Sequence, residues 1–377
     1  MRYREPFTLF RKRVNSGRLI YYYTVWTPDG LRRQYSTGKA TKADAFKVCL
    51  DLHHKNRLVP QKPITFQEYT KDWYVYEVCP YIQSKLLRGY QYSRTNADHQ
   101  RGYLYQYIWP EFGSLPMERI TVAQIEAWIL KLKRGGLANN SVNLILAVVK
   151  MVFNEAERLE VTVVNPAKAV KSLANDSQPK GFWTDEEIRS LFDPGNLERV
   201  WSGQRMQYLL NLLASQTGLR MGEIQGLQKD CLEPEHLKVM RSWDRTHGIK
   251  GTKTNETRFV PISGDLYQEL KELEEENTEG PYIFSASQGI QPIDHKAIDK
   301  WFKRALKAIG LGDAERKERR ISFHSYRWYL NTQLRIQGVP DVIVRSITGH
   351  SERSGMTEHY SNLTLETVKK ALVGVRF

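Results

Sequence analysis

Six residues in the second half of the sequence have the side-chain types needed to cleave a phosphodiester bond. In chain order they are Arg220, Lys253, His324, Arg327, His350 and Tyr360. Cleavage without a metal ion requires a nucleophile, positive charge beside the nonbridging phosphate oxygens, and a proton for the departing alkoxide. Because the set offers a candidate for each role, the sequence predicts chemistry at a phosphate.

The side-chain chemistry assigns some of these roles. A tyrosine phenol has a pKa of about 10, so it attacks only beside a base or in a strongly cationic setting, and Tyr360 is the candidate nucleophile. Arginine stays charged and its planar fork matches two phosphate oxygens, which suits Arg220 and Arg327. Lysine is a point donor whose pKa neighbouring cations can lower, so Lys253 suits the leaving-group acid.

Each residue alone also has an ordinary structural explanation. An Arg-x-x-Glu pair such as Arg220 and Glu223 is usually a solvated pair on a helix. A lysine in a polar hairpin keeps a strand edge in water, and Tyr360 could be a core aromatic. The order of the six residues and the sequence around each of them favour the joint functional interpretation.

The local sequence around each residue resembles the tyrosine recombinase family of phage and transposon integrases, and the resemblance covers most of the chain. AsnLeuLeuAlaSerGlnThrGlyLeuArgMetGlyGluIle, ending at Ile224, is similar to the family's first motif. ThrLysThr around Lys253, followed by ValProIle, is similar to the second, and His324-x-x-Arg327 to the third. Gly349-His350 and Tyr360 are similar to the fourth and fifth.

The resemblance implies a role for each residue. Arg220 and Arg327 would hold the nonbridging oxygens, with Glu223 supporting Arg220. Lys253 would lie on a β-hairpin and protonate the leaving 5′ oxygen, with Arg258 on the returning strand. The histidines complete the set: His324 would accept the proton of Tyr360, and His350 would hydrogen-bond the phosphate. No metal and no other cofactor is implied.

The resemblance also implies partners: double-stranded DNA, three further copies of the chain in a tetramer, and an excisionase or a host DNA-bending protein. The segment from Leu365 is expected to be a helix, docked either on a neighbouring protomer or on its own. Thr348 departs from the family, which usually has leucine there. Four other residues near the motifs are expected to be structural: His247, Tyr326, Tyr329 and His359.

Composition agrees with a nucleic-acid partner. Lys and Arg number 56 against 42 Asp and Glu, and this net charge of +14 favours a polyanion. No apolar run approaches the roughly 18 residues of a membrane span, and no signal peptide is expected, which favours the bacterial cytoplasm. Cys49, Cys79 and Cys231 lack a Cys-x-x-Cys spacing, so buried thiols are expected, not a zinc site or disulfides.

Residues 1–60 are expected to form a separate DNA-binding module, because they contain 13 Lys and Arg against 4 Asp and Glu. Turn residues separate three predicted strands, 7–14, 18–27 and 31–38, and Thr41 is expected to cap a helix reaching about Asn56. The module resembles the arm-binding domains of some integrases, whose strands would enter the major groove. The candidate contacts are Arg11, Arg13, Tyr22, Arg32 and Arg33.

The remaining chain is expected to be mainly helical. Residues 64–170 resemble a core-binding domain, with four helices, turns at 110–116 and 135–140, and a capping box at Thr121 and Gln124. Residues 171–183 have the composition of a linker, and residues 184–377 would form a mostly helical catalytic domain with a small sheet. The candidate DNA contacts in the helical domain are Lys131, Lys133, Arg134, Asn139, Asn140 and Lys150.

The predicted fold class is therefore multidomain and mainly α: a three-stranded sheet with one helix, a helical domain, and a mixed, mostly helical catalytic domain. Two other functions remain open. The chain could be a non-catalytic DNA-binding regulator with the same fold, which the complete residue set disfavours. It could also be a type IB topoisomerase, which shares the residue types, although the basic amino-terminal module favours site-specific recombination.

Overall fold

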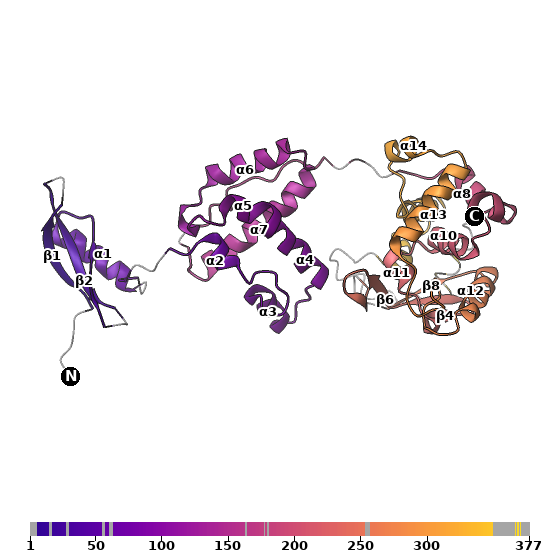
Figure 1. Cartoon of the computed structure of the whole chain (residues 1–377), viewed down its shortest axis with the longest axis horizontal. Coiled ribbons are helices and arrows are strands. Elements are labelled where there is room, and N and C mark those ends of the chain that lie inside the picture. The colour runs from indigo at the N-terminus through magenta and orange to yellow at the C-terminus, as the bar shows by residue number, and fades with distance from the viewer. Residues whose placement is uncertain are drawn as a thin grey trace. The chain divides into compact units, whose positions relative to one another are not determined.

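Two compact units, Met1–Asp176 and Ser177–Phe377, make up the chain. The structure is a computed structural model, shown in Figure 1. It describes residues 6–14, 17–27, 30–54, 57–59, 63–162, 164–176, 178, 181–252, 257–349, 366, 368 and 370. The predicted fold class is confirmed.

The first unit contains the following elements: β1 (Thr8–Arg13), β2 (Leu19–Trp26), β3 (Arg32–Ser36), α1 (Lys42–His54), α2 (Phe66–Thr70), α3 (Pro80–Leu87), α4 (Arg94–Tyr103), the π-helix η1 (Leu104–Ile108), α5 (Trp109–Phe112), the 3-10 helix η2 (Met117–Arg119), α6 (Val122–Arg134) and α7 (Asn139–Arg158).

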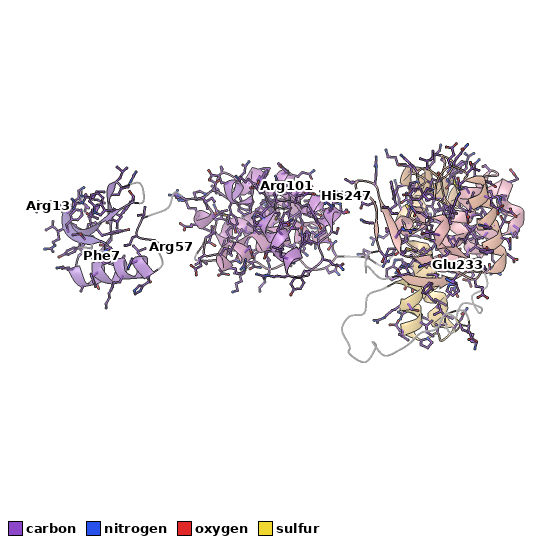
Figure 2. The ribbon with its side chains drawn as sticks, turned by 90° about the horizontal axis from the view of Figure 1, so that it is seen from below. Phe7, Arg13, Arg57, Arg101, Glu233 and His247 are labelled. Carbon is purple, nitrogen blue, oxygen red and sulfur yellow. The ribbon has the colours of Figure 1, made fainter. Side chains whose placement is uncertain are left out.

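The amino-terminal strands form one antiparallel sheet, ordered β1-β2-β3, and α1 covers one of its faces (Figure 1). Register pairs Thr8 with Thr24. Phe7 is buried where the sheet meets the helix, and its ring lies 5.6 Å from that of Phe46 on α1 (Figure 2). The Asp44 amide donates to the Thr41 hydroxyl at 3.2 Å, so the expected helix cap is present.

The helices of residues 64–162 surround a second hydrophobic core. The capping box at Thr121 and Gln124 is present at the start of α6. The segment holds α2 to α7, more helices than the four expected. The turn expected from residue 110 does not begin there, because Pro110 occupies the first turn of α5. At that position in a helix the missing N–H of proline costs nothing.

The buried face of α7 differs by part of a turn from the expected one. The sequence pattern predicts that five residues face the core: Leu144, Val148, Met151, Val152 and Ala156. Val148, Val152 and Ala156 are buried and Met151 is half-buried, but Leu144 is 48% exposed. The neighbouring Ile145 takes the buried position, since residues 145, 148, 152 and 156 recur at helical spacing and residue 144 lies about 100° away from 145.

Residues 170–176 are attached to α7. The Asn143 amide donates to the Leu173 carbonyl at 2.9 Å, and its oxygen accepts from the Leu173 amide at 2.8 Å. Lys150 Nζ donates to the Val170 carbonyl at 2.6 Å. Much of the segment with linker composition is therefore fixed to the helical domain by its polar groups.

The second unit contains the following elements: α8 (Asp185–Phe192), η3 (Pro194–Asn196), α9 (Leu197–Trp201), α10 (Arg205–Thr217), α11 (Met221–Gln225), η4 (Lys229–Cys231), β4 (Leu232–Glu233), β5 (His236–Val239), β6 (Arg241–Asp244), β7 (Gly248–Gly251), β8 (Arg258–Pro261), α12 (Gly264–Glu276), α13 (His295–Ala308), α14 (Asp313–Glu318), α15 (Ser325–Ile336) and α16 (Asp341–Thr348).

Helix α10 lies at the centre of this unit, in contact with α9, α11, α12, α13 and α15. The strands form two small antiparallel sheets, β4-β5-β8 and β6-β7, where the sequence predicts one. The chain changes sheet at Met240, between β5 and β6. Trp183 and Val368 are both buried in this core, so the helical residue Val368 packs within its own chain.

Tyr326 is 1% exposed and its ring stacks on Trp183 at 5.2 Å. Among the described residues its hydroxyl has no hydrogen-bond partner. Tyr326→Phe should therefore raise the free energy of unfolding of the second unit by about 1 kcal/mol, because it removes a buried unpaired polar group and keeps the ring. Urea denaturation measures this.

Tyr329→Phe is the matched control for this prediction. The Tyr329 hydroxyl donates to Asp185 Oδ1 at 2.7 Å, so its removal should lower stability by about 1 kcal/mol. A loss of stability in Tyr326→Phe as large as that in the control would contradict the prediction.

Candidate active site

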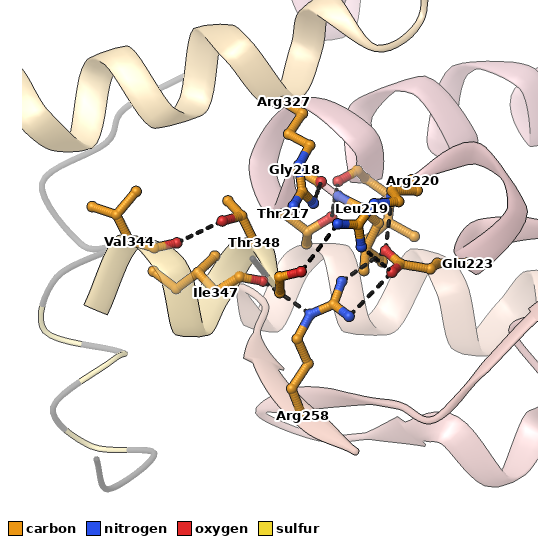
Figure 3. Close-up of polar contacts among 12 residues, drawn as sticks. Thr217, Gly218, Leu219, Arg220, Glu223, Arg258, Arg327, Val344, Ile347 and Thr348 are labelled. Carbon is orange, nitrogen blue, oxygen red and sulfur yellow. Dashed lines mark hydrogen bonds and ion pairs between the residues drawn. The ribbon is translucent and has the colours of Figure 1, made fainter. Parts of the chain in front are cut away.

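Two arginines, Arg220 and Arg258, pair with one buried carboxylate, that of Glu223, and a third, Arg327, lies near enough to interact electrostatically with this pair of arginines and with the carboxylate (Figure 3). Arg220 precedes α11, Arg258 begins β8, and Arg327 lies in the first turn of α15. Each comes from a different motif of the sequence. Three guanidinium groups and one carboxylate leave an excess of positive charge, which suits a bound anion.

Glu223 binds both the backbone amide and the guanidinium of Arg220. The Arg220 amide donates to Glu223 Oε2 at 2.9 Å, and its Nη1 donates to Oε1 at 2.7 Å. Its Nη2 donates to the Gly349 carbonyl at 3.0 Å. The side chain is 26% exposed, so it is fixed in orientation and still reaches solvent. Arg220 and Glu223 therefore pair, as the sequence predicts, and a role for this pair in the reaction stays a prediction.

Arg327 lies deeper than Arg220, with 2% of its surface exposed. Its Nη1 donates to the Gly218 carbonyl at 2.8 Å, at the carboxyl end of α10 (Figure 3). Burial lowers the pKa of the Arg327 guanidinium to about 9, and the positive charge of Arg220 adds to this effect. The fold therefore brings two like charges together, a cost that a bound anion would offset.

Glu223 remains ionised in this cluster. Burial alone would raise its pKa, but hydrogen bonds and charge from Arg258 and then Arg220 outweigh burial, and the pKa lies below its usual value. With 2% exposure, the carboxylate is a permanent internal anion at neutral pH.

Close packing at Gly222 fixes the β6-β7 hairpin beside this cluster. A Cβ at Gly222 would lie 2.8 Å from the Trp243 carbonyl oxygen on β6, which is shorter than such contacts allow. The absence of a side chain lets α11 approach the strand directly. The hairpin ends at Gly251, two residues before Lys253 in the sequence.

His324 immediately precedes α15 and lies one turn before Arg327. It is exposed, and its ring meets that of Trp328 edge to face at 6.3 Å. Lys253, His350 and Tyr360 lie outside the described residues. The structure thus brings Arg220, Glu223 and Arg327 together. The catalytic roles of these residues, and those of His324, Lys253, His350 and Tyr360, stay predictions from the sequence.

Thr348 and the tyrosines near Arg327 have structural roles. The Thr348 hydroxyl donates to the Val344 carbonyl at 2.8 Å, which satisfies a polar group where leucine is usual. Burial raises the pKa of Tyr326 well above its usual value, and burial followed by Asp185 does the same for Tyr329. His247 is exposed on the hairpin turn, with its amide donating to Asp244 Oδ1; His359 lies outside the described residues.

The three cysteines are buried and free, as expected. Within the described part of the chain, no group of three His, Cys, Asp or Glu side chains is placed to hold a metal ion. The same residues include no helix long and apolar enough to cross a membrane.

The strand register places the predicted DNA contacts of the amino-terminal sheet on two different faces. Arg11 and Arg13 pair with Tyr21 and Leu19, on the face that α1 covers, and Arg33 pairs with Val25 on that face. All three arginines are exposed at its edge. Tyr22 and Arg32 lie on the open face, together with three residues that are not among the predicted contacts: Phe10, Lys12 and Trp26. These three residues could have been identified from the sequence, because successive side chains along a strand point to opposite faces of the sheet.

Most of the predicted contacts in the helical domain have partners within the protein. Lys131 pairs with Glu111 at 2.7 Å, and Lys133 with Asp176 at 3.6 Å. Asn139 donates to the Ala174 carbonyl, and Lys150 to Val170. Arg134 and Asn140 are exposed. A DNA contact by any of the six remains a prediction.

Residues 183–366 match the model of the phage integrase family. Among curated proteins, the tyrosine recombinase XerA of Thermococcus onnurineus is 26% identical over 65% of this chain and 78% of its own length. The ICEBs1 integrase of Bacillus subtilis is 27% identical over 70% of this chain and 73% of its own.

Solved structures show the same fold. The integrase of transposon Tn1549, solved with a circular-intermediate DNA, has a TM-score of 0.60 and 19% identity, covering 78% of this chain and 98% of that one. A lambda integrase dimer bound to a core site has a TM-score of 0.56 and 17% identity, covering 93% of both chains.

Glu223→Gln should lower the free energy of unfolding of the second unit, Ser177–Phe377, called the catalytic unit below, by about 3 kcal/mol at pH 7. The substitution leaves Arg220 and Arg258 without their counter-ion. The pKa of Glu223 is lower in the folded than in the unfolded protein, so this stabilisation is present above about pH 4.3 and disappears as pH falls through the folded pKa. Denaturation at several pH values measures the difference, which should narrow in acid.

Glu233→Gln provides the control, since Glu233 is exposed on β4 (Figure 2). It should change stability little at any pH. A pH-independent effect of Glu223→Gln would show that the carboxylate charge is not what stabilises the cluster.

Proposed function

We propose that the protein is the site-specific integrase of a mobile element, because residues 183–366 match the phage integrase family model and the curated relatives include tyrosine recombinases and integrases. It would cut and rejoin DNA through a covalent 3′-phosphotyrosyl intermediate. The observation that carries the proposal is that Arg220 and Arg327, from two separate motifs, lie beside one buried carboxylate in a cluster with excess positive charge.

In the proposed reaction, the Tyr360 oxygen attacks a DNA phosphorus atom and the bond from phosphorus to the 5′ oxygen breaks. His324 accepts the phenol proton, and Lys253 protonates the departing oxygen, which leaves a 5′-hydroxyl. Arg220 and Arg327 hold the nonbridging oxygens, and His350 hydrogen-bonds the phosphate. Attack by the 5′-hydroxyl of another strand reverses these steps and rejoins the DNA without ATP, because the covalent bond preserves the energy of the broken one.

The partners follow from the same proposal. Double-stranded DNA would be bound by the catalytic unit, the helical domain and the amino-terminal sheet, and four copies would assemble across two sites. The lambda integrase has been solved both as a dimer on a core site and as a tetramer on a Holliday junction, which supports this assembly. An excisionase or a host DNA-bending protein would direct the reaction, and the bacterial cytoplasm would be its location.

For the amino-terminal sheet, we assign DNA contact to the open face. Its aromatic and basic side chains form one surface: the Tyr22 ring lies 5.9 Å from Phe10 and 5.4 Å from Lys12 Nζ, and Trp26 is 58% exposed. A two-stranded or three-stranded ribbon of this kind fits the major groove.

Tyr360→Phe should abolish the covalent adduct and leave DNA binding intact, because it removes only the nucleophilic oxygen. The measurement is a denaturing gel of the protein with a nicked suicide substrate made from the joined ends of its element, in EDTA. An adduct that survives in Tyr360→Phe would refute the nucleophile. Binding without an adduct in the unaltered protein would favour the non-catalytic regulator.

Arg32→Ala should weaken binding of the protein to its arm-type DNA and reduce the salt dependence of binding by about one unit of slope. Arg33→Ala, which removes the same charge from the adjacent exposed residue on the other face, should have a smaller effect on both quantities. Fluorescence anisotropy at several salt concentrations measures them, and equal effects would contradict the assignment of the open face.

A further inference from the structure

Arg258 joins three segments of the catalytic unit that lie far apart in the sequence. Its Nη2 donates to Glu223 Oε2 at 2.7 Å and its Nη1 to Oε1 at 3.2 Å. Its Nε donates to the Ile347 carbonyl at 3.1 Å, at the end of α16 (Figure 3). The side chain is 11% exposed. One guanidinium therefore connects the start of β8, the carboxylate after Arg220 and the end of α16.

We propose that Arg258 is a positioning residue for DNA cleavage, which acts by holding Glu223 and the end of α16 so that Arg220 keeps its orientation toward the phosphate. This inference rests on the proposed function, because it concerns the same reaction. Arg258 itself is placed to touch the protein and not the substrate, since its three nitrogens are used within the fold.

In the first part of this role, Arg258 shares the Glu223 carboxylate with Arg220. Glu223 Oε1 accepts from both Arg220 Nη1 and Arg258 Nη1, and Oε2 accepts from the Arg220 amide and Arg258 Nη2. Without Arg258, the buried charge would be balanced by Arg220 alone. The carboxylate would then hold the Arg220 guanidinium more strongly and compete with a phosphate for it.

The second part concerns the carboxyl end of α16. Arg258 binds the Ile347 carbonyl and Arg220 binds the Gly349 carbonyl, so both guanidinium groups hold the same turn of chain. Gly349 has a φ of 64°, and a Cβ there would lie 2.8 Å from Arg258 Nη1. The close approach of backbone and guanidinium requires glycine at this position. Movement of Arg258 would therefore release a backbone partner of Arg220 as well.

The bidentate fork is essential to this arrangement. A lysine at 258 would keep the charge but offers one point of donation, which cannot reach both Glu223 oxygens and the Ile347 carbonyl together. The charged groups that face Glu223 are Arg220 just before α11, Arg258 on β8 and Arg327 on α15. Loss of Arg258 removes the strongest influence that lowers the pKa of Glu223, so this pKa should rise.

The test is single-turnover cleavage of the nicked suicide substrate by the full-length protein at saturating DNA, with Kd measured in parallel. Arg258→Gln should reduce the cleavage rate by about a hundredfold with little change in Kd, because the phosphate clamp is displaced but the binding surfaces remain. The acid limb of its rate-versus-pH profile should move to higher pH, since Glu223 would protonate more readily. Arg258→Lys should resemble Arg258→Gln, and added guanidinium ion should partly restore Arg258→Gln.

Arg319→Gln is the matched control. Arg319 makes the same kind of contact away from the site, a bidentate pair with Glu187 at 2.6 and 2.9 Å and a bond to the Phe182 carbonyl at 3.0 Å. It should leave the rate and the pH profile at saturating DNA unchanged. If Arg258→Gln matches Arg319→Gln, the positioning role is overturned while the recombinase function stands. If the unaltered protein forms no adduct, both proposals are overturned.

Discussion

The catalytic unit depends on one buried anion. Glu223 is the internal counter-ion for a cluster of arginines that the fold would otherwise have to keep apart, since like charges at low exposure repel strongly. Its carboxylate organises the segment before α11 and the start of β8 at the same time. Helix α10 supplies the fixed support, because its carboxyl end places Gly218 beside Arg327. The hydrophobic core around α10 therefore determines where the charges meet.

Sequence alone located the local part of this arrangement. Arg220 and Glu223 are three residues apart, and the capping box at Thr121 and the cap at Thr41 likewise join residues three apart, so short-range geometry determines them. Arg258 was recognised only as a residue on the returning strand. Its bonds to Glu223 and Ile347 span 35 and 89 residues, and such separations have no local signature.

Other differences between the prediction and the structure arise because one sequence pattern is compatible with several structures. Polar residues suggested a linker after residue 170, yet Asn143 and Lys150 hold its beginning. Leu144 and Ile145 are both apolar, and only the phase of the helix decides which of them is buried. Basic residues alone identified the amino-terminal sheet as a binding surface. The alternation of side chains, which separates Arg32 from Arg33, was needed to choose between its faces.

The arginine cluster has a consequence for the choice of DNA sequence. Besides Glu223, its guanidinium groups bind backbone carbonyls at the carboxyl ends of α10 and α16, which are neutral and compete weakly with an anion. Such a site can grip any phosphodiester, because the phosphate group is the same at every step of a duplex. In the proposed reaction, the catalytic centre would therefore be indifferent to the bases around it. In that reaction, discrimination between one DNA sequence and another would fall to surfaces of the protein that take no part in bond breaking or joining.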